Sequence, residues 1–313
     1  MPTINRGDDY FAVVTYTGNG SSQSITGLRF QPDFVWIKGR SGATDHALYD
    51  AQRGVQKRLE SNTTDAEATS DNGVTAFNSD GFSIGSLAQV NTNGATYVAW
   101  CWKESATAGF DIVTTTMNAS GSTTINHSLG VTPSFVITKN RNGTVAWNVY
   151  STVLGTNQYL QLNATIAATT LSGFWGSPTS TQFTFGSPFA NTGTYVAYLF
   201  AEVAGFSRFG SYTGNGSSDG PFVFCGFRPR WVMIKRTDST QNWQIFDTSR
   251  DTFNVSQNSL FPNLSNAETS GYAIDVLSNG FKIRETGTNS NASGGTYIFA
   301  SFAENPFKNA LAR

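Results

Sequence analysis

The chain carries one sequence pattern three times, and this repetition constrains its fold more than any single motif does. Residues 16–20 read Tyr-Thr-Gly-Asn-Gly, and residues 212–216 repeat them. A proline followed closely by an apolar run ending in lysine occurs at 34–38, 135–139 and 231–235, and the middle copy lacks the Tyr-Thr-Gly-Asn-Gly motif. A period of about 100 residues is too long for a solenoid repeat, so each copy is expected to be one small β-domain.

Each copy predicts about six or seven short strands, the number typical of a sandwich. Asp80-Gly81 and Asn279-Gly280 are strong hairpin signals between strands. The expected fold is therefore all-β, with three tandem β-sandwich-like repeats, a pseudo-threefold arrangement and little helix. The expected domains are 1–104, a divergent second repeat at 105–203, and 204–313, which includes a C-terminal extension. Short linkers at 104–109 and 204–205 indicate that the copies pack together.

Composition excludes several classes of function. The net charge is −1 and only 13% of the 313 residues are charged, so there is no basic field for nucleic acid. No apolar stretch approaches the ~18 residues of a membrane span, so membrane insertion is not expected. No signal peptide is recognised, which predicts synthesis in a host cytoplasm. Cys101 and Cys225 stand at unmatched positions and are interpreted as buried free thiols.

The repeated polar signal is Asp-x-x-Arg, which occurs as Asp50 with Arg53 and as Asp247 with Arg250. The favoured interpretation is a local ion pair that fixes the loop after a strand. Ligand contact and catalysis are the alternatives. Glycoside cleavage needs two carboxylates about 5–10 Å apart, and each copy supplies only one at this position, which weakens a hydrolase interpretation.

Four aromatic residues could form exposed platforms on which a sugar ring stacks, but core or inter-domain packing is the favoured interpretation: Tyr49, Trp147, Trp175 and Trp243. Trp36, Trp100 and Trp231 lie in apolar strands and are expected in the core. The chain has two histidines. His46 occupies the position of the tryptophans Trp147 and Trp243, which predicts a packing role, and His127 is expected in a surface turn.

No metal site or cofactor is predicted. Two histidines and no cysteine cluster make a transition-metal site improbable. Oxygen-rich stretches at 8–9 and 71–73 lack the regular ligand spacing of a calcium loop, so calcium binding stays open.

The segments at 16–20, 32–38, 50–54, 78–82, 97–100 and 302–308 together resemble a family of proteins encoded by tailed bacteriophages. The resemblance covers essentially the whole chain and carries no catalytic residues. It implies a virion or virion-associated structural protein.

The resulting expectation is a non-enzymatic virion protein, a tail-fibre or adhesin component that contacts the host surface. A capsid head-decoration (cement) protein is the alternative, and a polysaccharide-degrading tailspike is a third. Expected partners are other virion proteins of the tail or capsid, a host surface glycan and further copies of the chain. Specificity is expected in the non-repeating segments 62–73, 157–180 and 253–270.

Overall fold

A computed structural model describes residues 4–70, 72–117, 122–186 and 192–304, and almost all of its regular structure is β. The first third contains η1 (Gly7–Asp9), β1 (Phe11–Thr17), β2 (Gln23–Thr26), β3 (Phe34–Gly39), β4 (Ala47–Asp50), β5 (Lys57–Arg58), β6 (Ala68–Thr69), β7 (Val74–Asn78), β8 (Gly81–Ile84), α1 (Ala88–Asn91) and β9 (Thr96–Trp102). The middle third contains η2 (Ala106–Ala108), β10 (Phe110–Met117), β11 (Ser122–Asn126), β12 (Phe135–Asn140), β13 (Asn148–Ser151), β14 (Gln158–Gln161), β15 (Thr169–Thr170), β16 (Gln182–Gly186) and β17 (Gly193–Phe200). The last third contains β18 (Ser207–Thr213), β19 (Phe222–Phe224), β20 (Pro229–Arg236), β21 (Gln244–Asp247), β22 (Ile274–Leu277), β23 (Gly280–Ile283) and β24 (Thr296–Ala303).

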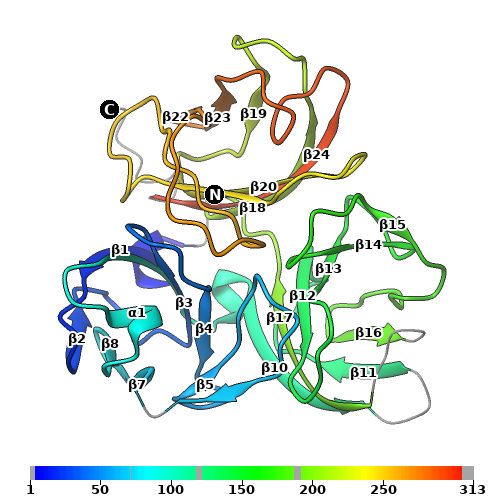
Figure 1. Cartoon of the computed structure of the whole chain (residues 1–313). Coiled ribbons are helices and arrows are strands. Elements are labelled where there is room, and N and C mark those ends of the chain that lie inside the picture. Colours follow the sequence, from blue (N-terminus) through cyan, green and yellow to red (C-terminus); the bar gives the residue numbers. More distant parts are fainter. Residues whose placement is uncertain (1–3, 71, 118–121, 187–191, 305–313) are drawn as a thin grey trace.

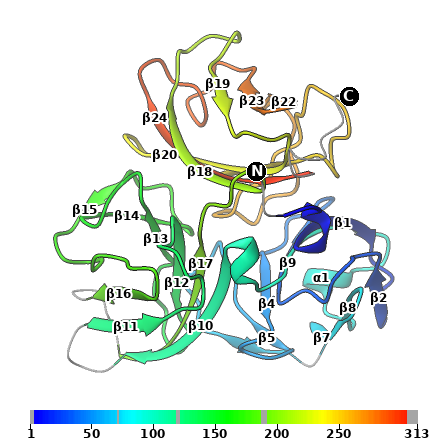
Figure 2. The same ribbon diagram turned by 180° about the vertical axis from the view of Figure 1, so that it is seen from behind.

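One strand order occurs in each third of the chain. The main sheets run β1-β9-β3-β4, β10-β17-β12-β13-β14-β15 and β18-β24-β20-β21, and all their pairings are antiparallel. Each main sheet is accompanied by an outer sheet: β2-β8-β7, β11-β16 and β19-β23-β22. We call β1–β9 unit 1, β10–β17 unit 2 and β18–β24 unit 3. Figures 1 and 2 show the three units around a common centre, seen from the two sides.

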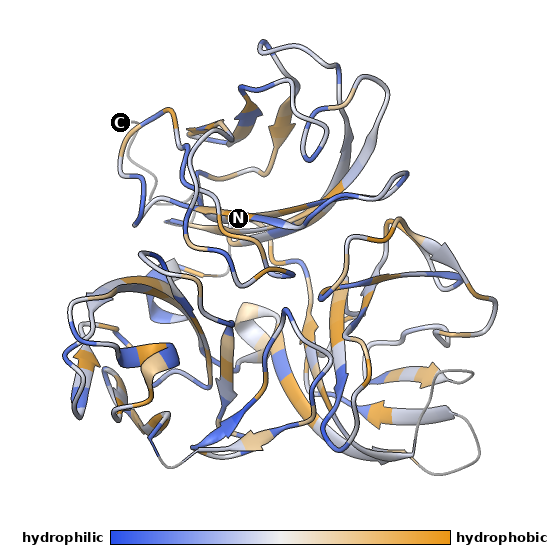
Figure 3. Ribbon diagram, viewed as in Figure 1, coloured by the Kyte–Doolittle hydropathy of each residue, from blue (hydrophilic) through white to orange (hydrophobic). Residues whose placement is uncertain are grey.

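The central strands of the main sheets are buried on both faces because side chains alternate across a strand. In β3, Val35 and Ile37 belong to the core between the two sheets of unit 1. Phe34 and Trp36 point to the other face and join a second core that all three units share. This double burial explains the continuous apolar runs in the sequence, and Figure 3 shows hydrophobic residues concentrated on the strands.

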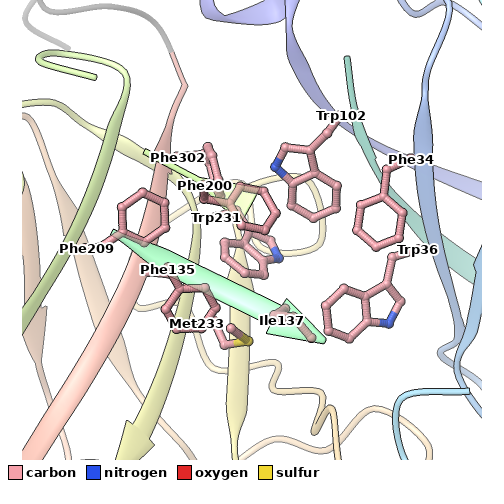
Figure 4. A pocket seen from close by; sticks show the side chains of 11 residues that line it. Phe34, Trp36, Trp102, Phe135, Ile137, Phe200, Phe209, Trp231, Met233 and Phe302 are labelled. Atoms are coloured by element: carbon pink, nitrogen blue, oxygen red, sulfur yellow. The ribbon is translucent and has the colours of Figure 1, made fainter. Parts of the chain in front are cut away.

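The shared core is an aromatic cluster at the centre of the molecule (Figure 4). Trp102 of unit 1 lies 5.8 Å from Trp231 of unit 3 between ring centroids, edge to face. Phe34 stacks on Tyr198 of unit 2 at 4.4 Å. A cavity of about 10 Å³, lined entirely by apolar residues, lies among these side chains. A void of this size is no larger than one water molecule, so the centre is packed rather than a binding pocket.

The expectation of an all-β, sandwich-like fold with little helix is confirmed. The finer expectations of three repeats with pseudo-threefold symmetry and of boundaries at 104 and 203 stay predictions, with which the recurring strand order agrees. Both cysteines are free and buried, as expected. The predicted C-terminal extension after residue 304 lies outside the described residues.

Candidate functional site: the junctions between units

Three loops join the units, and recurring polar residues of the neighbouring strands contact them. Strap 1 (residues 60–68), strap 2 (161–168) and strap 3 (261–268) each leave their own unit and contact the next one. Strap 1 contacts unit 2, strap 2 contacts unit 3, and strap 3 contacts unit 1. The contacts therefore form a closed cycle, and the chain is joined to itself in the way that subunits of a cyclic trimer are joined.

Junction 1–2 shows the pattern. The backbone amide of Val145 donates to the carbonyl of Thr64 at 2.9 Å, and the amide of Glu67 donates to Arg141 at 2.8 Å. The indole Nε1 of Trp147 donates to the carbonyl of Glu60 at 2.8 Å. The strap is thus held by backbone bonds at one end and by a buried aromatic side chain at the other.

The other two junctions use matching positions. Trp243 Nε1 donates to the carbonyl of Gln161 at 2.9 Å, and His46 Nε2 lies 2.9 Å from the carbonyl of Phe261. Backbone amides of Ala168 and Glu268 donate to Thr237 and Arg40 at 2.8 and 2.9 Å. Histidine replaces tryptophan in unit 1 because either ring can fill the site and place a nitrogen beside the strap carbonyl.

A buried lysine closes each junction. Lys38, Lys139 and Lys235 end the apolar runs of β3, β12 and β20 and are fully buried. Each ammonium donates to a carbonyl of the adjoining strap: Ser265 at 3.2 Å, Thr64 at 2.9 Å and Thr165 at 3.3 Å. Burial lowers the pKa of Lys38 and Lys139 to about 8 and that of Lys235 to about 7. The lysines are hydrogen-bond donors to the straps and face no open pocket.

The Asp-x-x-Arg signal is a buried local ion pair, as the sequence indicated. The side chains of Asp50 and Arg53 are wholly inaccessible and pair directly through Oδ2 and Nε. Asp247 and Arg250 do the same. Burial acts to lower the pKa of Arg53, but Asp50, Tyr198 and Glu67 together outweigh it and leave that pKa above its usual range. Complete burial places these four residues away from any ligand at the surface.

These pairs also reach across the junctions. The hydroxyl of Tyr198 in unit 2 donates to Asp50 Oδ2 at 2.7 Å. The indole of Trp100 in unit 1 donates to Asp247 Oδ2 at 3.0 Å. Each aspartate therefore anchors both its own loop and a closing strand of a neighbouring unit.

A glutamate on the strap completes each network. Glu67 accepts one hydrogen bond from Arg53 at 3.1 Å and two from Arg141 at 2.8 and 2.9 Å. Glu268 accepts one hydrogen bond from Arg250 at 2.9 Å and two from Arg40 at 2.8 and 2.9 Å. Burial acts to raise the pKa of Glu67, but the bonds from the arginines outweigh it and hold the pKa below its usual range.

Unit 2 lacks the whole network. At the positions of the aspartate, arginine and glutamate it has Ser151, Leu154 and Ala168. The position that corresponds to Tyr198 and Trp100 in the neighbouring unit 3 is Ala300, which has no donor to offer. All four partners are absent together because any one left alone would be a buried polar group without its partner.

The favoured interpretation of the four aromatic candidates, core or inter-domain packing, is confirmed, and the alternative of exposed platforms for a sugar is wrong. Tyr49, Trp147 and Trp243 are completely buried, and Trp175 is 2% exposed. Two of them are the junction donors described above, and Trp175 donates to the carbonyl of Gln158 within unit 2 at 3.0 Å. His127 is also buried at 8% exposure rather than lying on a surface turn. Tyr49 and Trp175 lie in the cores of their own units, whereas Trp147 and Trp243 contact the strap of a neighbouring unit, which periodicity cannot show.

Sequence reasoning missed the lysines, the strap glutamates and the role of the straps. The segments where specificity was expected contain these straps, so much of 62–68, 161–168 and 261–268 is used for internal contact. A signal was present, since a lysine ends every apolar run. Its partner lies in another unit, so no local pattern identifies it.

A second cavity, of about 260 Å³, lies between units 3 and 1. A glutamate follows the last strand of each unit, at Glu104, Glu202 and Glu304, and the partner of this glutamate differs from junction to junction. Glu202 pairs with Arg208 at 2.6 Å, and Glu104 hydrogen-bonds Asp111, with burial and that carboxyl raising the pKa of Glu104 to about 7. At the third junction Ala12 takes the corresponding place and leaves space beside the third glutamate. The cavity is lined by the charged residues Asp8, Arg29, Arg230 and Glu304 together with apolar ones.

The outer sheets differ from unit to unit. Short hydroxyl and amide side chains face outward from β2 and β8 and from β11 and β16, whereas β19 exposes Phe222 and Phe224. Among the described residues, no group of three or more His, Cys, Asp or Glu side chains is placed to hold a metal ion.

Residues 6–306 match the model of a family described as a domain of unknown function, DUF7483. The chain belongs to the DUF7483 family. The match spans all three units, so the DUF7483 family model takes in the straps and the shared core together. A search of curated proteins gave no match. In the parts of this DUF7483 chain that the structure describes, no helix has the length and apolar character needed to cross a membrane.

Proposed function

We propose that the chain is a non-enzymatic structural protein of a tailed-bacteriophage virion, a tail-fibre or adhesin component that contacts a host surface glycan. The resemblance to phage proteins supports the proposal that the chain is part of a virion. The observation that supports glycan contact is that the outer sheets of units 1 and 2 present uncharged, hydrogen-bonding side chains. The closed cycle of junctions supplies a rigid body on which such faces keep their geometry.

The outer faces carry ladders of paired polar groups. In unit 1, Ser24 and Ser83 lie 3.0 Å apart between hydroxyls. In unit 2, Thr124 and Thr184 lie 2.7 Å apart, and Gln182 donates to Asn126 at 3.0 Å. These groups are exposed and uncharged, so they can exchange hydrogen bonds with water for bonds with sugar hydroxyls at little cost in desolvation.

A head-decoration protein is the second candidate, because three units around a centre suit a threefold position on a capsid. The outer sheets argue against it. A threefold site would contact three equivalent faces, and here two faces are polar and the third is aromatic. Unequal faces suit a contact made by one side of the molecule.

The glycan contact is tested by measuring the binding of the full chain to a panel of host surface polysaccharides. Replacing Thr124 and Thr184 by alanine removes one outer ladder, and we expect roughly tenfold weaker binding to the best glycan, as for two lost hydrogen bonds. The matched control removes the exposed hydroxyl pair of Thr237 and Thr296, 2.7 Å apart and away from the outer sheets. Equal binding by all three proteins contradicts the proposed face.

Virion location is tested by counting copies per particle and by deletion. Tens of copies with lost adsorption support an adhesin. Hundreds of copies, with intact adsorption and fragile heads, support the decoration protein instead. Shortened polysaccharide chains after incubation would overturn the non-enzymatic assignment.

A further inference from the structure

The outer sheet of unit 3 ends in an exposed aromatic edge strand that the other units lack. Phe222 and Phe224 of β19 are 46% and 58% exposed. The intervening Val223 is buried and pairs with Phe281. In the same register β2 and β11 carry Ser24 with Thr26 and Thr124 with Asn126 around a buried isoleucine.

The backbone of these two phenylalanines also faces outward. Among the strands that the structure describes, β19 pairs with β23 alone, so within this part of the chain its other edge is open. Ile283 donates to the carbonyl of Pro221 at 3.1 Å, and the amide of Cys225 donates to Asn279 at 2.9 Å. Alternate residues of an antiparallel strand bond to the same neighbour, so residues 221, 223 and 225 bond to β23. The amides and carbonyls of Phe222 and Phe224 therefore point to the open edge.

Apolar side chains on an unpaired edge are what soluble proteins usually avoid, commonly by placing charges there. The nearest outward side chain on β23 is Lys282, and its charge is paired with that of Asp219 at 2.6 Å. The next outward position is Gly280, against which the Phe222 ring lies so closely that a Cβ there would be 3.1 Å from Phe222 Cε2. The edge is thus apolar in its side chains and unpaired in its backbone.

We propose that β19 pairs in antiparallel fashion with β19 of a second copy of this chain, about a twofold axis at Val223. This axis sets Phe222 opposite Phe224 of the second copy and Phe224 opposite Phe222. Both facing pairs are hydrogen-bonding positions of the open edge, so the pairing forms four backbone bonds. The same symmetry brings the aromatic side chains together as cross-strand pairs on one face. The strand is self-complementary, as a twofold interface requires.

The pairing goes beyond glycan contact and does not depend on it. A three-residue strand from each copy makes an interface smaller than the ~1,200 Å² of stable complexes, so the dimer is expected to be weak, in the micromolar range. The polar outer faces of units 1 and 2 remain free in the dimer. Two copies would therefore present twice the number of polar faces, which raises avidity for a repeated surface.

Sedimentation velocity of the full chain over a wide concentration range tests the pairing. The wild type is expected to change from monomer to dimer as concentration rises. The double variant Phe222→Ser with Phe224→Thr carries the residues of unit 1 and is expected to stay monomeric at concentrations at least tenfold higher. Phe253→Ser removes an 85% exposed ring elsewhere in unit 3 and should leave the dimer unchanged.

Hydrogen exchange of the wild type gives a second measurement that needs no variant. The amides of Phe222 and Phe224 should exchange more slowly at dimer concentrations, while the matching amides of Ser24 and Thr124 should not change. A wild type that is monomeric throughout overturns the proposal. So does a dimer whose β19 amides are not slowed, or one that the double variant retains. Binding of β19 only to a segment of another protein, with no self-association, also overturns it.

Discussion

At the scale of single residues, the chain places its recurring charges inside the molecule. Arg53 and Arg250 each satisfy an aspartate, a strap glutamate and a backbone carbonyl. The energy of such a group depends on its whole set of partners, since a buried charge without them is strongly unfavourable. Unit 2, which lacks the set entirely, shows that the fold itself does not require it.

The first prediction uses unit 2 as a template. Asp247→Ser alone leaves Arg250 short of its counter-charge, and we expect a loss of about 3–5 kcal/mol in the free energy of unfolding. Adding Arg250→Leu and Glu268→Ala gives unit 3 the three residues that unit 2 has at these positions, with Trp100 left in place, and should recover part of that loss. Urea denaturation of both variants measures the difference. A triple variant less stable than the single one would contradict the coupling.

The second prediction concerns pH and the junction lysines. Their folded pKa values of about 7 to 8 lie below the unfolded value of 10.5, so between these limits the unfolded chain binds more protons. The lysine contribution to the free energy of unfolding is therefore lowest at and below pH 7 and rises between pH 7 and 10. Urea midpoints across this range measure it. Lys235→Met should reduce the slope, and Lys103→Met, at an exposed position, should not.

At the scale of elements, local signals predicted hairpins correctly. Hairpins do join β7 to β8 and β22 to β23 at these signals, with Ser79-Asp80 and Ser278-Asn279 as the turn residues and Gly81 and Gly280 as the first residues of the strands that follow. Such turns depend on a few adjacent residues, which a sequence displays directly. The straps were not predicted as joining segments because their partners are 70 to 227 residues away in sequence.

The third prediction tests one of these turns. A Cβ on Gly280 would lie 2.1 Å from the carbonyl oxygen of Val223, so Gly280→Ala must move β19 away from β23. We expect a loss of about 1–3 kcal/mol in unfolding free energy, as for other forced overlaps. Gly42→Ala is the control, since no atom lies within 4 Å of that site. Similar losses for both variants would show that the close approach is not responsible.

At the scale of the whole molecule, the shared aromatic core joins the three units into one body. Its side chains come from β3, β9, β12, β17, β20 and β24 alike. Removing any unit exposes this core and breaks two of the three junctions. The units therefore depend on one another for burial in a way that separate domains do not.

The fourth prediction follows from that dependence. Calorimetry of the full chain should give a single unfolding transition whose van't Hoff and calorimetric enthalpies agree. A fragment of residues 1–203 should lack the near-ultraviolet circular dichroism of packed tryptophans. Two or three separate transitions, or a fragment that keeps this signal, would show that the units fold independently.

The sequence by itself determined the class of fold, the repeating pattern, the hairpin turns and the local Asp–Arg pairs. All of these arise from residues close together in the chain, where alternation and turn chemistry can be read directly. The tertiary structure alone decided which aromatic residues are buried, what the lysines and strap glutamates bind, and which edge is exposed. Those outcomes depend on contacts between units, and a polar loop or an aromatic strand looks the same in sequence whether a neighbouring unit covers it or not.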